Sequence, residues 1–130
     1  MQNMDWYHAL VKPALTPPDA WFGIVWTVLY VMMALALVMI LVKLSGKERV
    51  YAAALFLIQL GLNFSWSPLF FGAQNIAGAL ALIIVLWVSL SATVWCFFKY
   101  YKPAGWMMVP YWIWTSFAVY LNWGIWRLNP

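Results

Sequence analysis

Charged side chains are the scarcest class in this sequence. They make up 8% of its 130 residues, whereas 67% of the residues are hydrophobic. A water-soluble domain carries about a quarter charged residues, because its surface must face water. Seven Lys and Arg with three Asp and Glu cannot cover the outside of a soluble protein of 15.0 kDa. The composition therefore predicts an integral membrane protein whose outer surface contacts the lipid bilayer.

Cysteine and histidine are also nearly absent, and this limits the chemistry that the chain can carry. Cys96 is the only cysteine, so an internal disulfide is excluded. His8 is the only histidine, and no second histidine or carboxylate follows it at the spacing of metal ligands. No nucleophile triad, phosphate-binding loop or pair of carboxylates is found. We therefore expect no metal site and no required cofactor.

Two further absences narrow the function classes. No carboxylate or lysine lies in the middle of a long apolar stretch, which argues against a proton-driven pump. The basic residues flank apolar stretches and form no patch with helical spacing, so we expect no binding to nucleic acid. The first 20 residues also lack the basic start and apolar core of a cleavable signal peptide.

Four uncharged stretches are long enough to cross a bilayer. A helix rises 1.5 Å per residue, so about 20 apolar residues match a hydrocarbon core of about 30 Å. The alternating strands of a β-barrel are not seen. The expected fold class is all-α integral membrane, a single domain over residues 1–130. Its four transmembrane helices are predicted at about 20–43, 50–71, 76–99 and 104–127, with the second and third separated at the turn-forming residues 72–75.

The positive charges are distributed unequally between the two ends of the predicted bundle. The connections at 44–49 and 99–104, with the helix end beside them, carry Lys43, Lys47, Arg49, Lys99 and Lys102. The opposite side carries only Lys12 and Arg127. Because cytoplasmic loops are enriched in Lys and Arg, we expect these two connections in the cytoplasm and both chain termini outside.

Aromatic and polar residues recur at helical spacing, which places them on shared faces of the predicted helices. The stripes are Phe22, Trp26, Tyr30 and Met33 in the first helix; Gln59, Asn63, Trp66 and Phe70 in the second; Tyr111, Trp114, Ala118 and Leu121 in the fourth, with Thr115 and Asn122 beside them; and a sparser set, Trp87, Ser91 and Trp95, in the third.

Gln59 and Asn63 decide which way these stripes face. An amide in hydrocarbon needs a hydrogen-bonding partner, so both side chains should point into the bundle and bring the stripe of Trp66 and Phe70 with them. Converging aromatic stripes with a few amides and hydroxyls predict a cavity for a flat, largely apolar ligand. The alternative is that the same residues only pack together, with Asn63 joining helices by hydrogen bonds.

Three ordered blocks of unusual residues resemble the TspO/MBR family, the tryptophan-rich sensory proteins related to the mitochondrial translocator protein. The blocks are Trp6, Tyr7, Leu10, Lys12, Pro13, Thr16, Pro17, Pro18, Trp21, Phe22 and 25–30; then 62–72; then Val109, Pro110, Tyr111, Trp114 and 117–122.

The resemblance implies a commonly dimeric helical bundle, here in a bacterial or archaeal cell membrane, that binds porphyrins and in some members sterols or benzodiazepine-type drugs. Residues 1–19 would form a lid over the pocket. By motif position the lid contributes Tyr7 and Pro18, and the pocket is lined by Trp26, Asn63, Trp66, Trp114, Ala118 and Leu121. The stripes add Phe22, Tyr30 and Phe70 to this set of expected ligand-binding residues.

The sequence departs from the family pattern in two ways. The family has five helices, and this chain begins at the loop that should follow the first. The proposed cholesterol motif also fails, because Tyr120 directly follows Val119 and six residues separate it from Arg127. Small residues at Ala52, Ala53, Ala54 and Gly61 would allow a close contact in a homodimer.

Three functions remain open on the sequence. The first is a membrane receptor or carrier that binds porphyrin as its ligand. The second is an enzyme that degrades porphyrin under light and oxygen, with Trp26 and Trp114 as electron donors. The third is a structural membrane protein whose tryptophans only pack helices and bind no ligand.

Overall fold

The computed structural model describes residues 5–14, 16 and 18–129, and every regular element within them is helical. A short helix, α1, covers Asp5–Ala9. Four long segments follow: α2 at Asp19–Lys43, α3 at Gly46–Ser67 with the π-helix η1 at Pro68–Gly72, α4 at Ile76–Tyr100, and α5 at Lys102–Leu128. The all-α class is confirmed. The segment expected to be a loop over 1–19 contains α1, which sequence reasoning missed.

The ends of the long helices follow from local chemistry. Asn75 caps α4, since its side-chain oxygen accepts a hydrogen bond from the backbone N–H of Gly78. Gly46 opens α3 with a φ of 59°, a left-handed conformation that glycine adopts without strain. Pro68 has no N–H to donate within the helix, and from this residue the α3 ladder changes to the wider π form.

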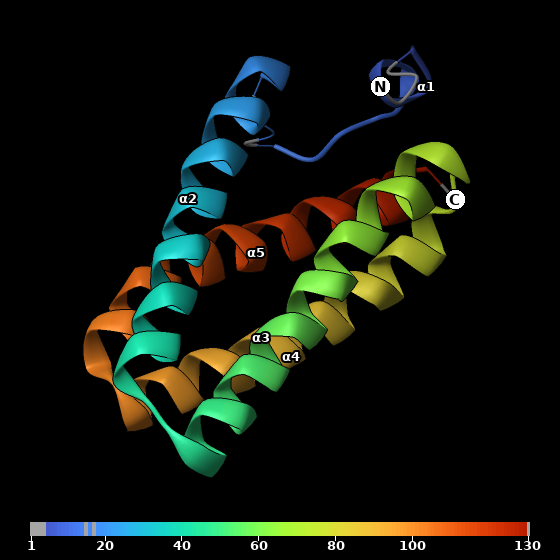
Figure 1. Cartoon of the computed structure of the whole chain (residues 1–130). Helices are drawn as coiled ribbons and strands as arrows, with labels where there is room; N and C mark the ends of the chain where they lie inside the picture. Colours follow the sequence, from blue (N-terminus) through green and yellow to red (C-terminus); the bar gives the residue numbers. More distant parts are fainter. Residues whose placement is uncertain (1–4, 15, 17, 130) are drawn as a thin grey trace.

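The long helices form an open bundle in which α4 and α5 pack together and α2 and α3 flank them (Figure 1). α4 packs most extensively along α5 and next along α3, while α2 packs along α5 and touches α3 much less. As a result α2 and η1 diverge toward the end where α1 lies, and the last turn of α5 lies at this same end (Figure 1). We call it the lid end.

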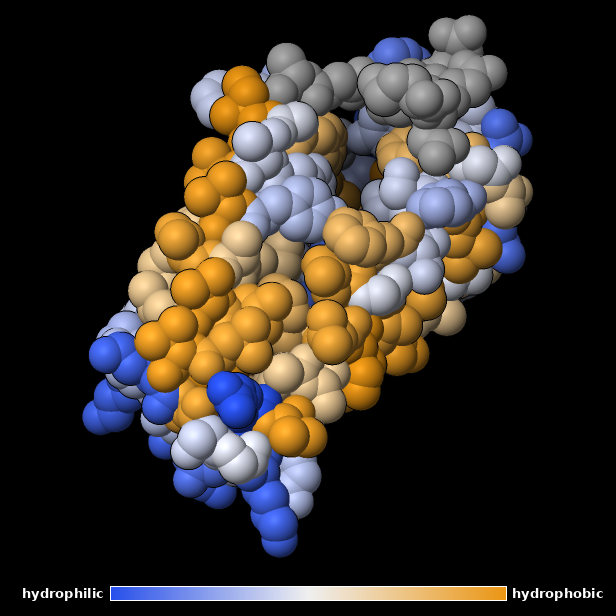
Figure 2. All heavy atoms as spheres, viewed as in Figure 1, coloured by the Kyte–Doolittle hydropathy of each residue, from blue (hydrophilic) through white to orange (hydrophobic). Residues whose placement is uncertain are grey.

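The surface suits a bilayer, and the protein is an integral membrane protein. Three segments of the described chain are long and apolar enough to span it: Trp21–Lys43, Gly46–Gly72 and Ile76–Tyr100. Large apolar side chains such as Val31, Val38 and Val88 are more than half exposed along them. Hydrophilic residues gather at the end opposite the lid (Figure 2), where the α2–α3 and α4–α5 connections carry exposed lysines and Arg49.

Candidate ligand-binding cavity

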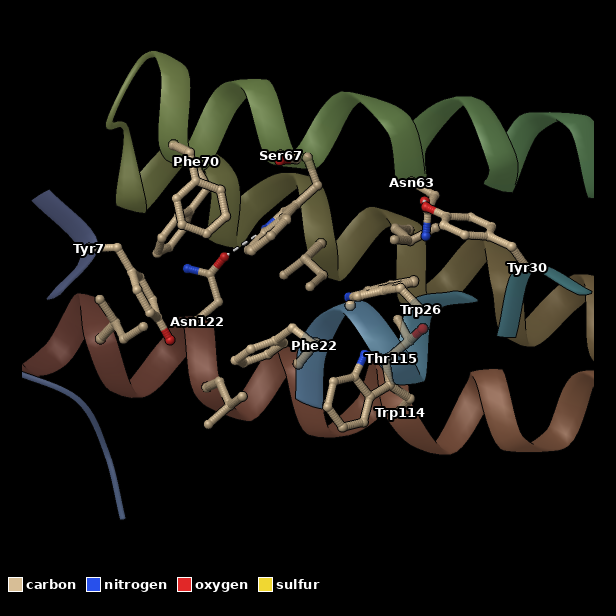
Figure 3. A pocket seen from close by; sticks show the side chains of 18 residues that line it. Tyr7, Phe22, Trp26, Tyr30, Asn63, Ser67, Phe70, Trp114, Thr115 and Asn122 are labelled. Atoms are coloured by element: carbon tan, nitrogen blue, oxygen red, sulfur yellow. Dashed lines mark hydrogen bonds between the residues drawn. The ribbon is translucent and has the colours of Figure 1, made fainter. Parts of the chain in front are cut away.

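A cavity of about 510 Å³ lies between α2, α3, η1, α4 and α5 and is closed at one end by α1 (Figure 3). Its lining is overwhelmingly apolar and aromatic. The lining residues are Tyr7, Phe22, Gly23, Trp26, Tyr30, Asn63, Trp66, Ser67, Phe70, Phe71, Ile83, Leu86, Trp114, Thr115, Ala118, Leu121, Asn122 and Ile125. This size and composition are typical of sites for small organic ligands.

Rings from α2 and α5 form the inner part of the wall. Trp26 lies edge-to-face with Trp114, with ring centroids 6.4 Å apart, and stacks on Tyr30 at 5.6 Å. Phe22 meets Trp114 edge-on at 5.8 Å. Phe22, Trp26 and Tyr30 face the same way because they are separated by one helical turn each. Their faces and edges leave aromatic surface available to a flat ligand.

The lid end of the cavity is built around η1. Trp66 stacks on Phe70 at 4.9 Å, and Tyr7 from α1 meets Phe70 and Phe71 edge-on at 6.3 and 5.5 Å. Two consecutive residues of this π-helix, Phe70 and Phe71, both line the cavity. Tyr7 is 5% exposed, so α1 covers this end closely.

A chain of side-chain hydrogen bonds joins three helices beside the inner end of the cavity. The Tyr30 hydroxyl donates to Oδ1 of Asn63 at 2.6 Å, and Nδ2 of Asn63 donates to the Tyr111 hydroxyl oxygen at 2.8 Å. Tyr111 in turn donates to Oε1 of Gln59 at 2.8 Å, and Nε2 of Gln59 points at the sulfur of Met33 at 3.9 Å. Every amide in this chain is thereby paired inside the bundle, as burial requires.

Two tryptophans that line the cavity differ in whether their indole N–H group has a hydrogen-bond partner. Nε1 of Trp66 donates to Oδ1 of Asn122 at 2.9 Å, and Nδ2 of Asn122 reaches the Ile76 carbonyl oxygen at 3.3 Å. Nε1 of Trp114 is buried and has no hydrogen-bond partner within the part of the chain that the structure describes. Buried donors are normally paired, so this N–H is an exception among the groups around the cavity.

The structure brings the expected residues together with one exception. All of the following line the cavity: Tyr7, Phe22, Trp26, Tyr30, Asn63, Trp66, Phe70, Trp114, Ala118 and Leu121. Pro18 is exposed at the start of α2 and is not among the lining residues. Gln59, Tyr111 and Met33 share the predicted stripes but lie behind the wall, fully or almost fully buried.

The sparser set on the third predicted helix, which was not among the expected ligand-binding residues, does not line the cavity. Trp87 and Ser91 face α5, where the Trp87 and Trp112 indoles donate to Ser116 and Ser91 respectively, at 2.7 and 2.9 Å. Trp95 is 65% exposed. α4 contributes Ile83 and Leu86 to the cavity instead, and no polar or aromatic signal marks these in the sequence.

Several other lining residues were also missed. Gly23, Ser67, Phe71 and Ile125 were not predicted, and Thr115 and Asn122 were placed only beside a stripe. Asn122 could have been predicted to face the interior, because an amide within an apolar helix needs a hydrogen-bonding partner. Among the described residues, no group of His, Cys, Asp and Glu could hold a metal ion. The arrangement can stack on an apolar ring and offer it a few hydrogen bonds.

Comparison with known proteins agrees with this architecture. The TspO/MBR family pattern matches residues 1–127. The chain is 45% identical over 97% of its length to the tryptophan-rich protein TspO of Chlorobaculum tepidum, covering 81% of that protein. It is 42% identical over 96% to the tryptophan-rich sensory protein of Cereibacter sphaeroides, covering 77%, and 32% identical over 98% to the human translocator protein, covering 77%. The chain belongs to the TspO/MBR family.

Proposed function

We propose that the protein is a membrane receptor or carrier that binds porphyrin-type ligands, flat and largely apolar, in the cavity between its helices. The observation that carries the proposal is the convergence of Trp26, Trp66 and Trp114, from three different helical segments, on one cavity. Packing alone would not require a cavity of about 510 Å³ at their meeting point.

The energetics are sufficient for useful affinity. Contacts between aromatic rings contribute about 0.5–1.5 kcal/mol each beyond the burial of their area. A ring system in contact with Trp26, Trp66 and Trp114 therefore gains about 1.5–4.5 kcal/mol from these contacts. Burial of the rest of the ligand adds to this, and micromolar binding needs about 8 kcal/mol in total.

The lid end suits the carboxylates of a porphyrin. Lys12 lies in the segment after α1, with its Nζ 4.6 Å from the centre of the Tyr7 ring that lines the cavity. Arg127, at the end of α5, lies over the Trp123 ring at 4.7 Å. By sequence these are the only Lys and Arg residues on this side of the protein. The ligand would therefore place its apolar ring inward and its acidic groups toward the lid.

The test is a titration of the purified protein in detergent with protoporphyrin, followed by quenching of tryptophan fluorescence. Trp26→Phe and Trp114→Phe should each weaken binding about fivefold, the effect of about 1 kcal/mol, and Asn63→Ala should also weaken it. Trp95→Phe is the matched control, because this tryptophan is 65% exposed outside the cavity, and it should bind like the wild type. Wild-type affinity in all three cavity variants would reject this site, and absence of saturable binding would favour the structural alternative.

A second function is favoured by the contact between Trp26 and Trp114. Both indoles line the cavity and lie 6.4 Å apart, so either could pass an electron to a light-excited porphyrin bound against them. The protein would then degrade porphyrin in light and oxygen. Illumination of the complex should convert the Soret band to a new product spectrum faster than free porphyrin bleaches. The Trp26→Phe, Trp114→Phe double variant should lose this conversion.

Orientation and assembly complete the proposal. The connections that carry Lys43, Lys47, Arg49, Lys99 and Lys102 would face the cytoplasm, which places the lid and its cations outside. The protein would act as a homodimer. Accessibility of a cysteine introduced at Ala9 to an impermeant thiol reagent, in intact cells, tests the orientation, and crosslinking in membranes tests the dimer.

A further inference from the structure

The C-terminal part of α5 and Asn129, the residue that follows it, hold the segment between α1 and α2. The Asn129 side chain pairs with both polar groups of the Val11 backbone: Oδ1 accepts from the Val11 N–H at 3.0 Å, and Nδ2 donates to the Val11 carbonyl oxygen at 2.7 Å. Nδ2 also donates to the carbonyl oxygen of Ile125, four residues earlier in the chain, at 2.9 Å. The amide is therefore fixed to the helix while it binds the segment.

Two further contacts continue this attachment along α5. The Tyr120 hydroxyl donates to the Ala14 carbonyl oxygen at 3.0 Å. Gly124 lies against the ring of Pro13, so closely that a Cβ on this glycine would be 2.7 Å from two of its carbons. We call these contacts, between Asn129, Tyr120 and Gly124 on one side and residues 11–14 on the other, the clasp.

The clasp determines where the lid residues of the cavity lie. Lys12 lies between two clasped positions, and its Nζ rests over the Tyr7 ring. The short helix that carries Tyr7 has only 5 residues, too few to be stable by itself. Its position depends on the packing of Trp6 and Tyr7 against η1 and on the attachment of the following segment to α5.

We propose that Asn129 is a positioning residue for the ligand: through the clasp it holds α1 and Lys12 over the cavity and slows the release of a bound molecule. Asn129 is not among the lining residues and acts only through the lid. The inference rests on the proposed ligand binding, but it assigns the control of ligand release to a residue outside the cavity.

The Asn129→Asp variant tests this with almost no change in shape. A carboxylate still accepts from the Val11 N–H, but it cannot donate to the Val11 carbonyl and places two acceptors against each other. Dissociation of protoporphyrin is measured by stopped-flow fluorescence after dilution into an excess of lipid vesicles. It should become about tenfold faster, because a loss of about 1.4 kcal/mol shifts the equilibrium between closed and open lid by that factor.

Asn75→Asp is the matched control. It introduces the same charge at the same end of the bundle and keeps the acceptor that caps Gly78, so it should release protoporphyrin at the wild-type rate. Gly124→Leu provides a second route, because its side chain displaces Pro13 without changing the charge. It should accelerate release as Asn129→Asp does.

A second measurement follows the lid without ligand. Cys96 is the only cysteine and is buried, so a nitroxide can be attached at an exposed Ala9→Cys in a Cys96→Ser background. The label should be restricted in the wild type and mobile with Asn129→Asp. If the wild type binds protoporphyrin and Asn129→Asp has the wild-type release rate and label mobility, the inference is overturned. If the wild type binds no protoporphyrin, the proposed function fails and the role in release with it, while the label still shows whether the clasp holds the segment.

Discussion

Replacing Asn63 with leucine should destabilise the bundle measurably, because this one amide connects three helices. In the native protein it accepts from Tyr30 on α2 at 2.6 Å and donates to Tyr111 on α5 at 2.8 Å. Leucine has the same branched shape as asparagine and a larger volume, so the change removes the two hydrogen bonds without creating a cavity. Tyr111 keeps its bond to Gln59, whereas the Tyr30 hydroxyl loses the only partner that the structure shows for it among the described residues.

The size of the effect follows from these contacts. Side-chain hydrogen bonds between membrane helices contribute about 0.6 kcal/mol on average and about 1.7 kcal/mol at most. Two of them give about 1–3 kcal/mol. The free energy of unfolding of the Asn63→Leu variant should therefore fall by that amount. Tyr30→Phe removes only one of the bonds and should cost about half as much.

The assay is unfolding by SDS in a mild detergent, followed by circular dichroism. Ser65→Ala is the control on the same helix, since the Ser65 hydroxyl donates to the Gly61 carbonyl within α3 and joins no other helix. Combining Asn63→Leu with Tyr30→Phe should cost less than the sum of the single variants, because both remove the same bond. A loss for Asn63→Leu no larger than that of Ser65→Ala, or strict additivity in the double variant, would refute the reasoning.

Two further changes test the packing of α4 against α5 in the same assay. Ser91→Ala leaves the Trp112 indole N–H without its acceptor at 2.9 Å and should cost about 0.6–1.7 kcal/mol. Gly105→Ala should cost about 1–3 kcal/mol, because its Cβ would be 2.6 Å from the Phe98 ring. Gly61→Ala is the glycine control, since nothing lies within 4 Å of its Cβ, and its stability should match or exceed that of the wild type. Equal losses at Gly105 and Gly61 would contradict the close packing at Gly105.

Helical periodicity was enough to predict much of the cavity wall. Phe22, Trp26 and Tyr30 are one turn apart, so any helix over this segment places them on a common face. Asn63 then identifies which faces are internal, since its amide must be paired. These two rules needed no knowledge of tertiary structure. They could not distinguish residues that line the cavity from Gln59 and Tyr111, which occupy the same stripes one turn behind it.

The rest depended on information that an apolar sequence does not carry. In a membrane protein both the lipid-facing and the internal sides of a helix are apolar, so Ile83 and Leu86 look the same as lipid-facing Ile84 and Val85. Phe71 lies in the π-helix that begins at Pro68, a change of geometry that the sequence analysis did not predict. The clasp joins Val11 to Asn129, which are 118 residues apart, and no local sequence pattern predicts such a contact.

Of the four long helical segments in the described chain, α5 alone is not among those apolar enough on average to span a bilayer. Its composition explains why. Its tryptophans and tyrosines carry polar N–H and O–H groups that lower its average hydropathy. In the structure these groups are used between elements: Tyr111 pairs with Asn63, Trp112 with Ser91, and Tyr120 with the lid segment. Nε1 of Trp114 has no partner among the described residues. α5 can therefore be less apolar than its neighbours, because the bundle pairs several of its polar side chains.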